Sequence, residues 1–179
     1  MKDKIEKTVD LNAPIERVWR ALTDYREFGE WFRVALERPF AEGEKTEGNI
    51  TYPGHEHMRL EAMIKTMDTN KLFAYTWCPV ADESGNAPLG GIETLVEFKL
   101  QPIHGGTRLQ IIESGFSAIP DEKSRLDALR TNTGGWDIQV FSFFCFWLSF
   151  SLDGSCIYWV RLFALEQPKL PPLMNALGR

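Results

Sequence analysis

The chain has 179 residues, of which 44% are apolar and 25% are charged, and its formal net charge is −5. This length is typical of one domain and is sufficient to bury a core without disulfide bonds. The acidic balance argues against a protein that binds nucleic acid through a broad positive surface. Charge is unevenly distributed, because residues 141–179 hold only 5 of the 45 charged side chains, and 23 of those 39 residues are apolar.

Cysteine usage and the first residues indicate the compartment. The chain is charged from Lys2 onward and lacks the apolar run of a secretory signal. Cys78, Cys145 and Cys156 show no CxxC spacing, which is typical of a reducing compartment. The longest uncharged stretch, residues 138–152, is shorter than the roughly 20 residues that span a bilayer. We therefore expect a cytoplasmic protein.

The first third of the chain predicts one strand followed by two short helices. Residues 4–11 alternate in polarity, as a half-buried strand does. Pro14 then suits the first turn of a helix with one apolar stripe. Asp24 has the spacing of an N-cap, so a second helix is expected to carry Trp31 and Phe32.

The middle of the chain predicts an antiparallel run of strands. Period-two segments occur near 45–52, 56–66, 71–78, 92–101 and 106–116. The sequence His104-Gly105-Gly106-Thr107 predicts a tight hairpin turn, in which paired glycines supply positive φ angles. Alternation places Leu109, Ile111 and Glu113 on the face that matches the apolar face of the preceding strand.

A long helix is predicted from Pro120 to about residue 151. Its expected inward stripe begins with Leu126, Leu129, Thr133, Trp136 and Val140 and continues through Phe143 and Trp147. Beyond residue 140 the other faces of the helix are apolar too. Such a segment has three interpretations, which are core packing, association with a membrane surface or a second subunit, and an atypical ending caused by an altered reading frame or a recent extension.

Together these elements predict an α+β fold of helix-grip type. A curved antiparallel sheet of about six strands would wrap around the long C-terminal helix, and the two short helices after the first strand would close one end. We assign residues 1–150 to this domain and residues 151–179 to an atypical apolar C-terminal extension. The space between such a sheet and its helix is concave and apolar, as small-molecule sites are.

A series of short motifs resembles one family in particular. The motifs are Ala13-Pro14, Val18-Trp19, Ala21-Leu22-Thr23-Asp24, Trp31-Phe32, Thr76-Trp77, Thr94-Leu95-Val96-Glu97-Phe98, Gly106-Thr107-Arg108-Leu109, Glu113-Ser114-Gly115-Phe116 and Gly135-Trp136. The chain resembles the bacterial Hsp90 ATPase activator-like (AHSA1-like) family of the START-like, or SRPBCC, superfamily over residues 3–140. The resemblance implies a hydrophobic-cavity fold, and it stops where Val140–Trp147 replaces the usual amphipathic helix with charged residues.

The predicted function is binding of a small hydrophobic or amphipathic ligand between the sheet and the C-terminal helix. The expected ligand-binding residues are Trp31, Phe32, Tyr75, Trp77, Phe98, Glu113 and Trp136. Each aromatic residue could instead serve only as core. A binding protein is favoured over the alternatives, an enzyme of cyclase or hydrolase type that uses the same cavity or a co-chaperone that activates the Hsp90 ATPase.

Glu113 is the candidate general acid or base, because burial on the inward face would raise its pKa. The other interpretation is that the strand register shifts and Glu113 faces solvent. His55 and His57 are expected on one face of a strand but lack a third metal ligand, so no metal and no cofactor are predicted. The candidate partners are a second copy of the chain and a chaperone. Nucleic acid is not expected as a partner, and membrane contact is expected only if the apolar tail is real and exposed.

Overall fold

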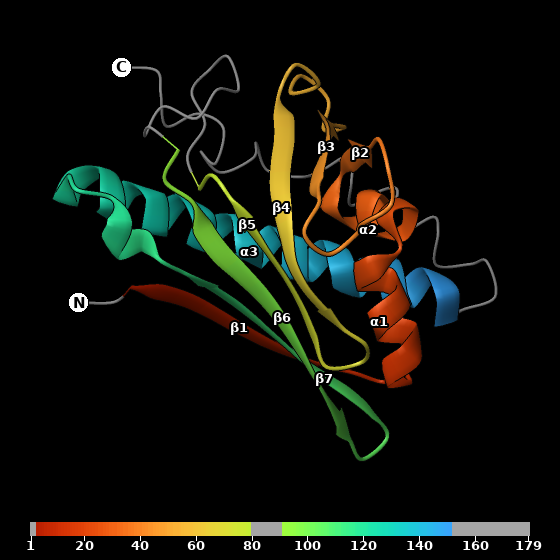
Figure 1. The fold of residues 1–179 in the computed structure, drawn as a ribbon. Coiled ribbons are helices and arrows are strands. Elements are labelled where there is room, and N and C mark those ends of the chain that lie inside the picture. The colour runs from red at the N-terminus through yellow and green to blue at the C-terminus, as the bar shows by residue number, and fades with distance from the viewer. Residues whose placement is uncertain (1–2, 80–90, 152–179) are drawn as a thin grey trace.

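A seven-stranded antiparallel sheet curves around one long helix in the computed structural model, which describes residues 3–79 and 91–151 (Figure 1). The strands follow the order β1-β7-β6-β5-β4-β3-β2. Their bounds are β1 Lys4–Leu11, β2 Val34–Leu36, β3 Lys45–Ile50, β4 Arg59–Asp68, β5 Leu72–Trp77, β6 Thr94–Ile103 and β7 Gly106–Ser114. The predicted helix-grip class is confirmed, with one more strand than expected, the short β2.

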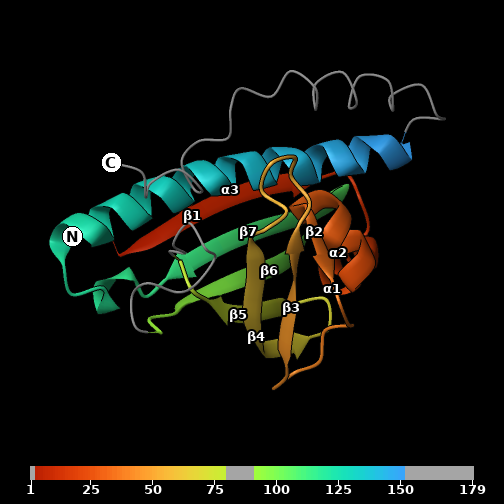
Figure 2. The same cartoon turned by 90° about the horizontal axis from the view of Figure 1, so that it is seen from above.

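Two short helices, α1 (Ile15–Thr23) and α2 (Tyr25–Phe32), follow the first strand, as predicted. The Asp24 side chain accepts hydrogen bonds from the backbone N–H groups of Arg26 and Glu27, so it caps the start of α2. Val18, Phe28 and Trp31 are fully buried, and the indole of Trp31 donates to the backbone oxygen of Ala21. Seen from above, both helices lie near one end of α3 (Figure 2). They therefore close that end of the core.

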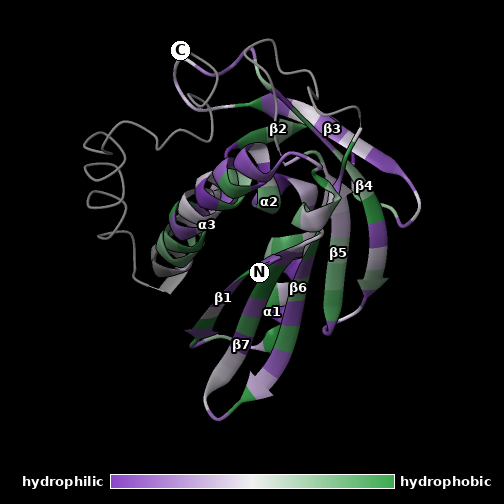
Figure 3. Cartoon of the chain, turned by 90° about the vertical axis from the view of Figure 1, so that its left-hand side faces the viewer, coloured by the Kyte–Doolittle hydropathy of each residue, from purple (hydrophilic) through white to green (hydrophobic). Residues whose placement is uncertain are grey.

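The long helix α3 extends over Glu122–Ser151 and lies inside the curve of the sheet (Figure 3). Its predicted inward stripe is wrong at the start, because Leu126 is 46% exposed whereas Ala128 and Asn132 are buried. Trp136 and Phe143 are buried as predicted. The buried face of α3 therefore begins at Ala128 and includes the polar side chain of Asn132, which hydrogen-bonds inside the core. Hydrophobicity alone does not identify this face.

The apolar half of α3 packs on the two short helices. Phe143 is 1% exposed and its ring lies 4.8 Å from that of Trp31. Ser142 Oγ donates to the backbone oxygen of Trp31, and the guanidinium of Arg17 lies 4.8 Å above the ring of Trp147. The core interpretation therefore holds for Phe143, Phe146 and Trp147, whereas Phe144 is exposed. Residues 152–179, most of the predicted extension, lie outside the described residues.

Turn geometry corrects two details of the predicted hairpins. Of the two glycines in the predicted turn, Gly105 has a positive φ, of 79°, and Gly106 does not, because the register pairs Ile103 with Gly106 and leaves a two-residue turn. Gly106 is already in β7, where a Cβ atom would collide with the backbone oxygen of Leu11. This glycine is therefore required by the close approach of β1 and not by a left-handed backbone.

The segment before β4 also differs from prediction. Strand pairing begins at Arg59 and not at residue 56, so His55 and His57 lie in turns between β3 and β4. Most of the segment between the strands predicted near 71–78 and 92–101 lies outside the described residues. Among the helices that the structure describes, none combines the length and the hydrophobicity that crossing a membrane requires.

Candidate functional site

Strand alternation brings one row of side chains across the inner face of the sheet. Tyr75 on β5 is paired with Val96 on β6, and Val96 is paired in turn with Glu113 on β7. The row continues to Ile64 on β4 and to Ile5 on β1. All five side chains are buried, and four are neutral. The predicted inward position of Glu113 is confirmed, so one carboxyl group lies within an otherwise uncharged row.

Glu113 accepts hydrogen bonds from four side chains on three elements. The Trp77 indole at the end of β5 donates to Oε1 over 2.8 Å, and Thr94 Oγ1 at the start of β6 donates to the same oxygen over 2.7 Å. From α3, Asn132 Nδ2 donates to Oε1 over 3.1 Å, and the Trp136 indole donates to Oε2 over 2.7 Å. The carboxyl group thus joins the sheet to the helix that it grips.

The environment of Glu113 acts on its pKa in two opposite directions. Burial raises the pKa above its ordinary value of 4.5, because an apolar environment disfavours the charged form, and this effect dominates. The hydrogen bonds from Thr94, Trp136, Trp77 and Asn132 oppose it, because they stabilise the carboxylate. None of the ion pairs between residues that the structure describes includes Glu113.

Two buried oxygen atoms next to this network are unsatisfied. Tyr75 Oη and Asn132 Oδ1 have no hydrogen-bond partner among residues 3–79 and 91–151, although both side chains are at least 98% buried. Burial raises the pKa of Tyr75 well above its usual range, and the nearby charge of Glu113 raises it further. Buried polar atoms normally have partners. The site therefore holds unused hydrogen-bonding capacity of a kind that a bound polar group can use.

The predicted aromatic residues gather around the carboxyl group. The rings of Phe32, Trp77 and Trp136 are mutual neighbours, with centroids 6.1 to 6.3 Å apart. Contacts of the same kind add the remaining predicted rings, which are those of Tyr75, Phe98 and Trp31. Trp77 is only partly buried, whereas the other five are buried. The structure thus brings all seven predicted site residues together, and their binding role remains a prediction.

Two polar members of the site were not predicted as such. Thr94 lies on the buried face of β6, but alternation gives it no role, and the sequence pattern does not identify Asn132. The available signal for Asn132 is its position four residues before Trp136, which puts both on one face of α3. An asparagine that faces the core of a helix requires a polar partner, which here is Glu113.

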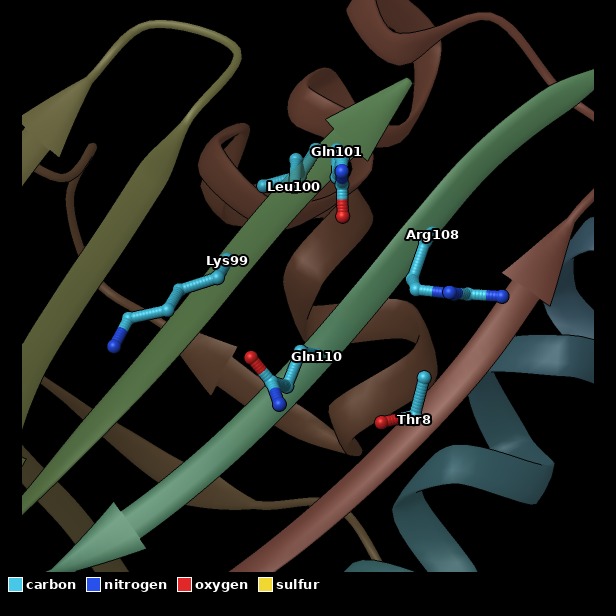
Figure 4. A pocket seen from close by; sticks show the side chains of 6 residues that line it. All are labelled: Thr8, Lys99, Leu100, Gln101, Arg108 and Gln110. Carbon is cyan, nitrogen blue, oxygen red and sulfur yellow. The ribbon is translucent and has the colours of Figure 1, made fainter. Parts of the chain in front are cut away.

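The outer face of the sheet carries a shallow polar depression of about 320 Å³, shown in Figure 4. Its lining residues come from β1, β6 and β7 and are Thr8, Lys99, Leu100, Gln101, Arg108 and Gln110. Its charged side chains have partners, because Arg108 forms a two-bond ion pair with Asp10 and Lys99 pairs with Glu97. This depression lies on the face opposite Glu113 and is not the predicted site.

The predicted absence of a metal site rests on the histidines. The rings of His55 and His57 lie 6.5 Å apart in the turns before β4. Over the part of the chain that the structure describes, no group of three His, Cys, Asp or Glu side chains has the arrangement of a metal site.

Comparisons with known proteins give the family. The family described as "Activator of Hsp90 ATPase homolog 1-like protein" matches residues 12–140. No curated protein matches the sequence. A protein from Nitrosomonas europaea has a similar structure, with a TM-score of 0.64 at 16% identity, over 82% of this chain and 95% of that chain. A protein from Mesorhizobium loti gives 0.60 at 22% identity, over 78% and 92%.

A third similar structure is the Aha1 dimer from Colwellia psychrerythraea, with a TM-score of 0.58 at 15% identity, over 79% of this chain and 93% of that chain. Identities this low establish the fold alone. The sequence match establishes more, because residues 12–140 are well over half of the chain. This protein therefore belongs to the Activator of Hsp90 ATPase homolog 1-like family.

Proposed function

We propose that the protein binds a small hydrophobic or amphipathic molecule between the sheet and α3, with Glu113 as its polar anchor. The observation that carries this proposal is the burial of the Glu113 carboxyl group among aromatic rings, with four side-chain donors and no ionic partner among the described residues. A polar group in an apolar, aromatic surround is the usual composition of a small-molecule site.

The most accessible member of the aromatic cluster is Trp77. It is half-buried at the end of β5, and its ring lies against Trp136, Phe32 and Tyr75. Displacement of this one ring would remove one of the three donors to Oε1 of Glu113, and Thr94 and Asn132 would remain bound to that oxygen. A ligand therefore needs to move one side chain at the end of a strand, and the buried rings keep their packing.

Fluorescence titration with N-phenyl-1-naphthylamine, a neutral apolar fluorophore, tests the proposal. We expect saturable binding with fluorescence enhancement, and we expect Trp77→Ala to weaken binding by about tenfold, the equivalent of about 1.4 kcal/mol of lost contact. The matched control is Trp19→Ala, which removes a half-buried indole from α1. Absence of binding to a folded sample, or equal weakening by both variants, would contradict the proposal.

An enzymatic use of the same site is a second candidate, and the raised pKa of Glu113 favours it. A carboxyl group that holds its proton nearer to neutral pH is suited to general acid or base catalysis in cyclase- or hydrolase-type reactions. Once a substrate is known, Glu113→Gln is expected to abolish turnover while leaving binding detectable. Unchanged turnover in that variant would remove this candidate.

A further inference from the structure

The charge balance around Glu113 points to the chemical class of the ligand, and this inference rests on the proposed function. We infer that the site takes a small organic cation, an ammonium group on an apolar or aromatic body, which hydrogen-bonds to Glu113 and lies against the surrounding rings. If the site binds a small hydrophobic molecule that is not a cation, the proposed function stands and this inference fails.

The first argument is the missing positive charge. Glu113 is completely buried, yet its four side-chain partners among the described residues are all neutral: two indoles, a hydroxyl and an amide. Removing a carboxylate from water is costly, so a buried carboxyl group either is paired with a cation or holds its proton to higher pH, and the raised pKa of Glu113 agrees with a missing cation. Lys7, which points to the inner side of β1, is paired with Asp137 instead. A cationic ligand supplies the charge that the described part of the site lacks.

The second argument is the type of the unused polar atoms. Asn132 Oδ1 is an acceptor, and it belongs to the amide whose nitrogen already contacts Glu113. Tyr75 Oη accepts as well as donates. Glu113 Oε2 accepts one bond, from Trp136, and has capacity for another. An ammonium group carries up to three donors and no acceptor, which matches this surplus of acceptors. A carboxylate ligand would instead add acceptors and a like charge.

The third argument is the aromatic surround. Faces of Trp, Tyr and Phe rings attract cations, with Trp the strongest. Trp77, Trp136, Phe32 and Tyr75 lie next to one another around the carboxyl group, with ring centroids about 6 Å apart. The ammonium group would take the place of the Trp77 indole N–H on Oε1, and the displaced ring of Trp77 would then cover the ligand. The aromatic rings and the Glu113 carboxylate would therefore both attract the ammonium group of the ligand.

Three probes on one scaffold test the inference by isothermal titration calorimetry at pH 7. They are 2-phenylethylamine, protonated at this pH, the neutral 2-phenylethanol and the anionic phenylacetate. We expect the cation to bind at least about tenfold more tightly than the alcohol, and phenylacetate to bind more weakly than either. Glu113→Gln, which keeps the shape of the side chain, is expected to reduce the preference for the cation over the alcohol to about twofold or less.

Tyr75→Phe is the second variant, in case Glu113→Gln does not fold. It removes an oxygen atom that has no partner among the described residues, so its fold is expected to be retained. We expect it to lower the preference for the cation by about threefold, because one acceptor is lost. An unchanged preference in whichever variant folds would overturn the inference.

The outcomes separate the two levels of the proposal. If 2-phenylethanol and N-phenyl-1-naphthylamine bind but 2-phenylethylamine binds no more tightly than the alcohol, the proposed function stands and the cation inference fails. If no probe binds to the folded protein, both fail.

Discussion

The indole nitrogen of Trp136 lies 2.7 Å from Oε2 of Glu113 and is that oxygen's hydrogen-bond donor among the described residues. One bond thus links α3 to β7 at the centre of the core. A hydrogen bond from a neutral donor to an ionised carboxylate is stronger than one between two neutral groups. The site and the attachment of the gripped helix therefore depend on the same two side chains.

Loss of this bond gives the first prediction. Trp136→Phe keeps an aromatic ring but leaves Oε2 without its donor, and we expect the free energy of unfolding to fall by about 1.5–3 kcal/mol. Urea denaturation followed by circular dichroism measures it. Trp19→Phe, the same change at a half-buried position on α1, serves as the control and should cost less than half as much. Equal costs would show that the Glu113 bond contributes no stability of its own.

Stability is expected to depend on pH through Glu113. Burial raises its pKa in the folded protein above the ordinary value of 4.5, so above pH 4.5 the unfolded chain loses this proton first. The folded state then binds more protons, and this group's contribution to the free energy of unfolding falls as pH rises through the raised pKa. The charge of Glu113 acts on Tyr75, whose pKa is raised well above 10.0, so Tyr75 does not titrate in this window.

Comparison of the wild type with Glu113→Gln isolates this effect, because the other carboxyl groups titrate in both proteins. We expect the stability of the wild type relative to the variant to decrease above pH 4.5, with a slope of at most about 1.4 kcal/mol per pH unit. Urea denaturation at a series of pH values measures the difference. A difference that is flat, or that grows with pH, would mean that the pKa of Glu113 is not raised.

Adjacent phenylalanines test whether the apolar half of α3 is core. Phe143 is 1% exposed and contacts Trp31, whereas Phe144 is 43% exposed. Phe143→Ala is expected to cost about 3–5 kcal/mol through the cavity that it leaves. Phe144→Ala is expected to change stability by about 0.5 kcal/mol or less. Thermal denaturation distinguishes them, and two small effects would show that α3 does not pack on α2 beyond residue 140.

Two glycines allow two reasons for requiring glycine to be tested separately, which are the close approach of another strand and a left-handed backbone conformation. At Gly106 a Cβ atom would collide with the backbone oxygen of Leu11, so Gly106→Ala should force β1 away from β7 and cost about 1–3 kcal/mol. Gly43 has a φ of 83° and open space around its Cα, so Gly43→Ala should cost only the left-handed conformation, about 1 kcal/mol.

Hydrogen exchange distinguishes the two glycine variants further. Faster exchange of β1 amides, such as those paired with β7, is expected in Gly106→Ala and not in Gly43→Ala. Unchanged exchange of β1 in both variants would contradict the assignment of Gly106 to strand contact.

The sequence predicts those parts of the fold that depend on periodicity. Alternation along residues 94–100 and 107–113 gives the buried face, and with it the inward position of Glu113. The part that periodicity misses is polar. Asn132 interrupts the apolar stripe of α3, and its burial depends on a hydrogen bond to Glu113, 19 residues away on another element. No pattern within the helix sequence indicates such a contact. Leu126, which the predicted stripe includes, is 46% exposed.

Other errors also came from contacts that the local sequence does not contain. The spacing of the stripe predicts that Phe143 faces inward, and Phe143 is buried while Phe144 is exposed, but the local sequence does not indicate which residues cover Phe143. The position of α1 and α2 decides this, through Trp31. Gly106 was assigned to a turn because the closeness of β1, which lies about a hundred residues earlier in the chain, cannot be seen in a hairpin motif.

The central claim is that small molecules bind at Glu113, and the indole N–H signals report on it most directly. In ¹H–¹⁵N spectra, the signals of Trp77 and Trp136 belong to the donors of this carboxyl group, and Trp→Phe variants assign them. During titration with 2-phenylethylamine and, separately, with N-phenyl-1-naphthylamine, we predict saturable shifts of both signals with at least one probe, while the signal of Trp19 stays in place. Unmoved Trp77 and Trp136 signals at saturating concentrations of both probes, in a folded sample, would contradict the account.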